Sequence, residues 1–188
     1  NNGIPGVMTV NASMHYLNRY GILTGNNIVI TTNNDSVYQT ALELQEAGSK
    51  VTILDSRKNV NLDLPKEIDV HLNTLPFSIN GRKKIEGLDV CKATDKNNKN
   101  TIICDQVLIS GGWSPIVNLV SHRGIKPIWN QENLCFVPGD IKENITVVGS
   151  AKGIWNKNDC VKSGLVGANE AMNTLGIHKK EISFPSVG

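Results

Sequence analysis

The sequence predicts an α/β fold in which a parallel β-sheet carries an inserted β-meander. Three observations lead to this prediction. Residues 27–31 (NIVIT) and 50–54 (KVTIL) are short, apolar, β-branched runs, as buried parallel strands are. A helical segment joins them, giving the roughly 30 residues of a right-handed βαβ unit. Three further β-rich segments follow with turn-forming residues between them, which is typical of antiparallel strands.

The ends of the connecting helix are marked by residues that favour helix termini. Asp35 and Ser36 are both common N-cap residues, so we expect the helix to begin after one of them. Gly48 is expected to end it as a C′ glycine. Apolar residues follow at helical spacing between these points: Val37, Ala41 and Leu44.

The predicted meander occupies the middle of the chain. The turn Ile79–Arg82 contains Asn-Gly, a strong hairpin signal. We expect residues 95–100 to form a polar tip and residues 101–110 to return as one further strand. The three β-rich segments before that tip are Asp69–Leu72, Leu75–Ile79 and Lys84–Ala93.

The two ends of the chain are less regular. Residues 7–20 are expected to form a short extended lead-in and a helical turn or two. Paired glycines and a proline make Ser110–Pro115 a loop. Towards the end, Ile145–Val148 is predicted as a strand, followed by a helix over about Asn158–Leu175. One face of that helix carries Val161, Leu165, Ala168 and Met172, with the small residues Gly164 and Gly167 alongside.

Composition excludes several classes of function. The net charge of +2 comes from scattered lysines and arginines, so we expect no nucleic-acid partner. No stretch approaches the roughly 20 apolar residues of a membrane span, and no signal peptide is evident, so we expect a cytoplasmic protein without a membrane partner. The four cysteines have no metal or redox spacing and are expected to be free thiols. No arrangement of side chains indicates hydrolytic catalysis, and we assign no catalytic or metal-binding residue.

The loop after the first strand, Thr32–Ser36, lies where a Rossmann-like domain binds a dinucleotide. Such loops carry three glycines, which let the backbone approach the pyrophosphate, and an acid about 20 residues later binds the ribose. Here Thr32, Asn34 and Val37 replace the glycines, while Asp55 is in place. Two interpretations stay open: a retained nucleotide site, or a Rossmann-shaped domain kept for packing. The nucleotide contacts would be Asn34, Asp35, Ser36 and Asp55.

Two glycine-containing loops are further candidates for cofactor contact. A predicted strand leads into a small-residue loop and a helix, a pattern that allows a ligand to approach the backbone and equally allows tight helix–sheet packing. The residues of that loop are Gly149, Ser150, Ala151, Lys152 and Gly153. Gly112 is the candidate in the other loop, beside Trp113, which could stack on a ligand or pack within the protein.

Taken together, these segments resemble the pyridine-nucleotide-disulfide oxidoreductase fold, and most specifically the α subunit of heterotetrameric sarcosine oxidase and related amine and amino-acid oxidases. The resemblance covers nearly the whole chain. The strings Asn18–Gly21 (NRYG), Thr32–Ser36 (TNNDS) and Ser110–Pro115 (SGGWSP) are its most specific part. Further matches are Pro5–Met8, Cys104-Asp105, Pro138–Asp140, Gly149–Gly153 and Gly164–Gly167.

The resemblance implies a piece of a longer subunit. Residues 1–21 would be a linker and lead-in helix, 22–112 an inserted NAD(P)-domain-like Rossmann unit, 113–178 the returning C-terminal segment of the first dinucleotide-binding domain, and 179–188 a tail. NAD would bind in the first domain, where Gly149–Gly153 match the loop that contacts the cofactor in related flavoproteins. Many relatives have Gly-Asp where this chain has Gly149-Ser150.

The parent enzyme implied by the resemblance oxidises an N-methyl amino acid such as sarcosine, with FAD or FMN in the complex and tetrahydrofolate as acceptor of the one-carbon unit. The partners would be the rest of the α subunit and other subunits of the oxidase, and the fragment alone would be an inactive scaffold. Two alternatives are a cofactor-free Rossmann-shaped interaction module and an NAD(P)H-dependent reductase domain. The sequence does not distinguish sarcosine from dimethylglycine, opines or proline as the substrate.

Overall fold

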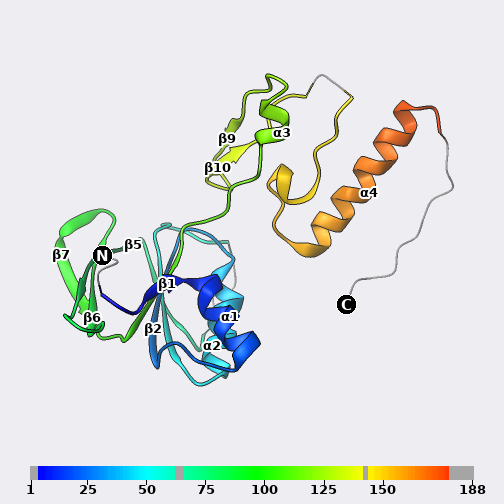
Figure 1. Ribbon diagram of the computed structural model, residues 1–188. Helices are drawn as coiled ribbons and strands as arrows, with labels where there is room; N and C mark the ends of the chain where they lie inside the picture. Colours follow the sequence, from blue (N-terminus) through cyan, green and yellow to red (C-terminus); the bar gives the residue numbers. More distant parts are fainter. Residues whose placement is uncertain (1–3, 62–65, 142–143, 178–188) are drawn as a thin grey trace. The chain divides into compact units, whose positions relative to one another are not determined.

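The computed structural model describes residues 4–61, 66–141 and 144–177. The chain divides into two compact units, Asn1–Gly112 (unit 1) and Trp113–Gly188 (unit 2), and each is described by itself (Figure 1). The predicted tail, residues 179–188, lies outside the described residues.

Unit 1 is built on a parallel sheet whose strands lie in the order β1-β8-β2-β3-β4. The βαβ unit predicted from the sequence is confirmed, because β2 and β3 pair in parallel along their whole length. β4 pairs in parallel with β3, so residues 69–72 belong to this sheet and not to the meander as predicted. The strands are β1 (Val7–Thr9), β2 (Asn27–Thr32), β3 (Lys50–Asp55), β4 (Asp69–Leu72) and β8 (Gln106–Ser110).

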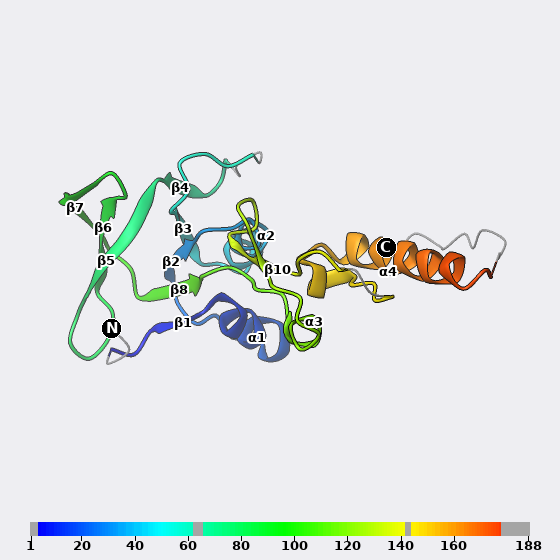
Figure 2. The ribbon, with the colours of Figure 1, turned by 90° about the horizontal axis from the view of Figure 1, so that it is seen from above.

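Two helices cover one face of this sheet, as Figure 2 shows: α1 (Val10–Tyr20) and α2 (Val37–Glu46). The helix α1 is longer than the turn or two predicted. The Thr9 hydroxyl caps its start by accepting a hydrogen bond from the Ala12 amide, and Gly21 ends it in a left-handed conformation. The core on this face is formed by side chains from both layers, including Ile28, Ile30, Ala41, Leu44, Ile53 and Leu108.

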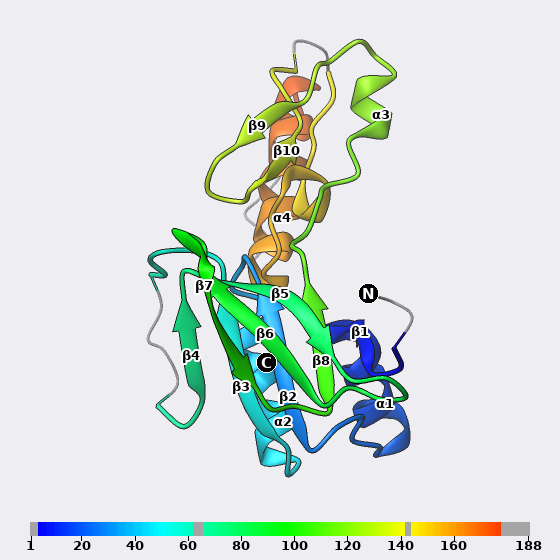
Figure 3. The same ribbon diagram turned by 90° about the vertical axis from the view of Figure 1, so that its left-hand side faces the viewer.

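The antiparallel meander packs on the opposite face (Figure 3), where a second core includes Val29, Leu54, Leu88 and Val107. Its strands are β5 (Thr74–Asn80), β6 (Gly87–Lys92) and β7 (Asp95–Ile102). The predicted polar tip at 95–100 was wrong, because these residues form most of β7, an exposed strand held by its backbone pairing with β6. Residues 101–110, predicted as one strand, belong to two: β7 ends at Ile102 and β8 begins at Gln106.

Unit 2 contains a short helix, a β-hairpin, a 3₁₀ turn and one long helix. These are α3 (Asn118–Ser121), the antiparallel strands β9 (Ile128–Asn130) and β10 (Cys135–Val137), η1 (Gly149–Lys152) and α4 (Lys157–Thr174). The Asn156 side chain caps α4 by accepting from two amides of its first turn. No helix in the described ranges has the length and apolar character needed to cross a membrane.

The predicted strand at Ile145–Val148 was wrong. A strand needs a neighbour to complete its hydrogen-bond ladder, and none of the strands described in unit 2 pairs with these residues. The segment packs on α4 instead, where Gly167 is the buried residue of the helix. A Cβ added to Gly167 would lie 2.5 Å from Val148 Cγ1 and 3.1 Å from Thr146 Cγ2. The glycine is therefore required for the close approach of the two segments.

We expect Gly167→Ala to lower the unfolding temperature of unit 2, because the added methyl group forces residues 146–148 away from α4. Tryptophan fluorescence measures this directly, since the three tryptophans of the chain (Trp113, Trp129 and Trp155) all lie in unit 2. The matched control is Gly164→Ala, whose Cβ would meet nothing within 4 Å. It should raise helix stability by about 0.5–1 kcal/mol. Equal unfolding temperatures for the two variants would contradict the packing argument.

Candidate functional site

The carboxyl ends of β2, β3 and β8 form one edge of the parallel sheet in unit 1. Their last residues are in register, with Thr32 opposite both Asp55 and Ser110. Open α/β sheets bind their ligands at this edge, in the loops that follow the strands. Five residues predicted as candidates lie at this edge: Asp55 at the end of β3, and Asn34, Asp35, Ser36 and Gly112 in the loops. The other candidates, Gly149–Gly153, belong to unit 2.

The loop between β2 and α2 is closed by its own side chains. Asn34 Oδ1 accepts hydrogen bonds from the Ser36 backbone amide at 3.1 Å and from the Ser36 hydroxyl at 2.5 Å. Asn34 Nδ2 donates to Asn33 Oδ1 at 3.0 Å and also lies 3.4 Å from the Ser110 carbonyl oxygen. A nucleotide phosphate would use amides at the start of this helix. Here the Asn34 side chain accepts from the Ser36 amide.

Asp55, the residue expected to bind a ribose, is fully buried. Its Oδ1 accepts hydrogen bonds from the Arg57 backbone amide at 2.9 Å and from Arg57 Nε at 3.1 Å. Its Oδ2 accepts from the Tyr38 hydroxyl and from Arg57 Nη2, each at 2.8 Å. A buried carboxylate needs partners of this kind, because an unpaired charge in the interior is very costly. Both oxygens are thus used by the chain itself.

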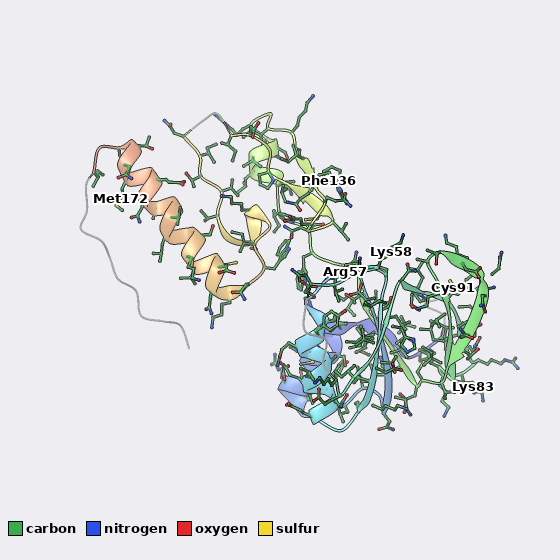
Figure 4. The ribbon with its side chains drawn as sticks, turned by 180° about the vertical axis from the view of Figure 1, so that it is seen from behind. Arg57, Lys58, Lys83, Cys91, Phe136 and Met172 are labelled. Atoms are coloured by element: carbon green, nitrogen blue, oxygen red, sulfur yellow. The ribbon has the colours of Figure 1, made fainter. Side chains whose placement is uncertain are left out.

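Arg57 connects this carboxylate to the loop after β2. Its Nη1 lies 2.7 Å from Asp35 Oδ1, and its side chain is 23% exposed. Burial alone would lower the pKa of Arg57, but the hydrogen bonds and charges of Asp55 and Asp35 outweigh it and raise that pKa above its ordinary value. Burial, followed by the hydrogen bond from Tyr38 to Asp55, also raises the pKa of Tyr38. Figure 4 shows Arg57 and Lys58 in the segment that follows β3.

Sequence reasoning missed both Arg57 and Tyr38. An arginine two residues after a strand-terminal acid was the available signal, since Arg in this region of a Rossmann domain can contact a 2′-phosphate. In the structure the guanidinium group faces two carboxylates of the protein instead. Gly112, at the same edge, is required by its backbone conformation: its φ is 96°, which side-chain-bearing residues rarely adopt, and a Cβ there would also lie 3.2 Å from Asn33 Oδ1.

The second candidate loop, Gly149–Gly153, forms the 3₁₀ turn η1 and its cap in unit 2. Gly149 and Gly153 both have positive φ, 61° and 90°. The Gly149 amide donates to Ser163 Oγ at 3.2 Å, and a Cβ on Gly153 would lie 3.0 Å from Val137 Cγ1. Backbone conformation therefore accounts for Gly149, and backbone conformation together with the close approach of Val137 accounts for Gly153. Ser150 and Lys152, in contrast, are exposed.

The four cysteines are free thiols, as predicted, and three of them, Cys91, Cys104 and Cys135, are buried. Burial, with a smaller contribution from Asp105, raises the pKa of Cys104 to about 11, so this thiol is protonated at neutral pH. Within the described ranges, no group of three or more His, Cys, Asp or Glu side chains is arranged to hold a metal ion.

The chain is 34% identical to the sarcosine oxidase α subunit of Rhizobium meliloti (strain 1021) over 178 residues, which is 94% of this chain. It is 28% identical to the α subunit from Corynebacterium sp. (strain U-96) over 95% of the chain. The chain is a homologue of part of the sarcosine oxidase α subunit. It spans 18% and 20% of the length of these two relatives. An opine oxidase subunit of Rhizobium meliloti is also similar, at 25% identity over 91% of this chain and 38% of its own length.

Solved structures show the same fold. Lactococcus lactis thioredoxin reductase superposes on 91% of this chain and 58% of its own with a TM-score of 0.63 at 20% identity. L-proline dehydrogenase from P. horikoshii superposes on 96% of this chain and 32% of its own with a TM-score of 0.57 at 18% identity. No family model matches the chain. These findings confirm the predicted family resemblance and the Rossmann-type α/β fold.

We expect Tyr38→Phe to destabilise unit 1 by about 1.5–3 kcal/mol, the range for a hydrogen bond to a charged group. The substitution removes the hydroxyl that donates to the buried Asp55 and leaves the ring in place. Urea unfolding followed by circular dichroism measures the loss. Tyr20→Phe is the matched control, because Tyr20 is 57% exposed. A Tyr38→Phe protein as stable as the control would show that this hydrogen bond contributes little to the network.

Proposed function

We propose that this chain is the dinucleotide-domain scaffold of a sarcosine-oxidase-like α subunit, in which residues 22–112 are an inserted Rossmann unit that holds no nucleotide. The observation that carries this proposal is that, at the carboxyl edge of unit 1, the chain's own side chains bond to the groups that a nucleotide would use. Asn34 pairs with the Ser36 amide at the start of α2, and Arg57 pairs with Asp55. The homology to sarcosine oxidase α subunits supports the same assignment.

Unit 2 is, in this proposal, the returning segment of the first dinucleotide-binding domain, residues 113–178. Two features support it. Residues 145–148 form no regular secondary structure and have no strand partner in the described part of unit 2, and a groove of about 580 Å³ is lined by this segment and α4. Many large apolar side chains of this unit are also exposed, which is unusual for a complete domain. Examples are Ile116, Leu119, Ile128, Trp129, Phe136 and Leu175.

The cofactor of that first domain would be NAD, and Gly149–Gly153 would lie against it. The exposed Ser150 and Lys152 are the side chains of this loop available for such a contact. The parent enzyme would oxidise an N-methyl amino acid such as sarcosine, with a flavin in the complex and tetrahydrofolate receiving the one-carbon unit. The partners would be the rest of the α subunit and the other subunits of the oxidase.

Two observations disfavour the alternative of an NAD(P)H-dependent reductase domain. Asp55, which would bind the ribose, is hydrogen-bonded to Arg57 instead, and the sequence contains no Cys-x-x-Cys motif. A cofactor-free interaction module would also have no nucleotide at the carboxyl edge of unit 1, so this edge does not separate it from the leading proposal. The two differ in what unit 2 does, since only the scaffold places Gly149–Gly153 beside a nucleotide. An experiment on that loop therefore separates them.

We expect Gly149→Val to reduce the NAD content of the complete parent α subunit, because the larger side chain would block approach to the backbone of η1. The measurement is bound nucleotide per subunit after purification, with circular dichroism to verify folding. Gly176→Val is the matched control: Gly176 has a similar φ of 70°, so the backbone strain is comparable. Equal loss of NAD from both variants, or no loss from Gly149→Val, would contradict the cofactor contact.

The isolated chain gives a second test of the same proposal. Calorimetric titration with NAD⁺ should show no binding to unit 1. Binding in the micromolar range that Asp55→Ala abolishes would overturn the assignment of unit 1 as a nucleotide-free scaffold.

A further inference from the structure

We propose that Arg57 occupies the position of a nucleotide ribose in unit 1, so that the dinucleotide site is closed by a side chain and can be reopened by removing it. We call Arg57, with Asp35 and Asp55, the Arg57 latch. This inference rests on the proposed function in one respect, that unit 1 of the unaltered chain holds no nucleotide. It goes further in naming the residue responsible and the class of ligand excluded.

The position of the guanidinium group is the first argument. In a Rossmann domain the ribose lies between the loop after the first strand of the βαβ unit and the acid that ends the second. Arg57 bridges these two places, with Nη1 2.7 Å from Asp35 Oδ1 and Nη2 2.8 Å from Asp55 Oδ2. A ribose and this side chain could not both lie there.

The hydrogen bonding of Asp55 is the second argument. Arg57 Nε and Nη2 donate to the two carboxylate oxygens at 3.1 and 2.8 Å. Two adjacent ribose hydroxyls are donors that a carboxylate can accept in the same side-by-side manner. The bonds from the Tyr38 hydroxyl and from the backbone amide of residue 57 do not depend on the arginine side chain. Asp55 would therefore keep two partners if that side chain were removed.

The architecture around the latch is the third argument. The side chain of Arg57 is 23% exposed, so its removal opens a path from Asp55 to solvent. On the other side, a Cβ on Gly111 would meet nothing within 4 Å, which leaves room after β8. The register of Thr32, Asp55 and Ser110 that a bound dinucleotide requires is intact. Two obstacles to a pyrophosphate remain at the start of α2: the charge of Asp35, which repels it, and the Asn34 side chain, which accepts from the Ser36 amide.

The test compares NAD⁺ binding to the full 188-residue chain and to three variants by calorimetric titration. We expect Arg57→Ala to bind NAD⁺ at least about tenfold more tightly than the unaltered chain, a difference of about 1.4 kcal/mol. Asp35→Asn should show a smaller gain, because it removes the repulsive charge and one end of the latch. Arg82→Ala removes an exposed arginine of the loop between β5 and β6 and should bind no better than the unaltered chain.

Each outcome decides a different point. A folded Arg57→Ala chain with no gain in affinity overturns the latch and leaves the proposed function standing. Tight binding to the unaltered chain overturns both proposals. If Arg57→Ala fails to fold because Asp55 loses its charged partner, Asp35→Asn decides, since Arg57 still pairs with Asp55 when no ligand is bound but is no longer held to the loop after β2, so that a ribose displaces it more easily. An affinity for NAD⁺ unchanged by Asp35→Asn would then overturn the latch.

Discussion

The buried carboxylate of Asp55 is the constraint on which the edge of unit 1 depends. Asp55 ends β3, an interior strand of a sheet whose two faces are both covered, by helices on one side and by the meander on the other. A carboxylate there has no water to solvate it. Removing one partner from a buried pair typically costs about 3–5 kcal/mol. Tyr38 and Arg57 are therefore held to Asp55, and α2 and the residues after β3 are held with them.

The same constraint explains why the loop after β2 can lack glycine. Glycines in such a loop serve the approach of a pyrophosphate to the backbone. Where Arg57 reaches across to Asp35 and Asn34 pairs with Ser36, the loop is stabilised by its own side chains and needs no open backbone. Asparagine and aspartate suit this arrangement, because their short side chains form hydrogen bonds with nearby backbone groups. The absence of glycine from this loop and the side-chain contacts at the carboxyl edge are thus two aspects of one arrangement.

Local sequence patterns predicted the central strands and the connecting helix of unit 1, but not the side-chain contacts at the carboxyl edge of its sheet. The strands at 27–31 and 50–54 were predicted because each is apolar and bounded by polar residues. β7 was missed because its residues are polar and exposed, and its hydrogen bonds come from β6. Thr101 Oγ1 in β7 also donates to Asp89 in β6, and such bonds lower the pKa of Asp89. Arg57 was missed because its contact with Asp35 depends on the pairing of β2 with β3, which sequence spacing does not describe.

At Ile145–Val148 the error is the reverse, a strand that was predicted but does not form, and it shows how the two units differ. The sequence pattern of a strand is present there, but a strand forms only where another supplies its ladder. In unit 1 the chain supplies every neighbour that β2 needs, and its central side chains are buried. In unit 2 the side chains of Thr146 and Val148 pack on Gly167 of α4, while Val161 and Val166 of the same helix are exposed. Unit 1 pairs β2 on both sides and buries its core, whereas in unit 2 residues 145–148 have no strand partner among the described residues and several large apolar side chains are exposed.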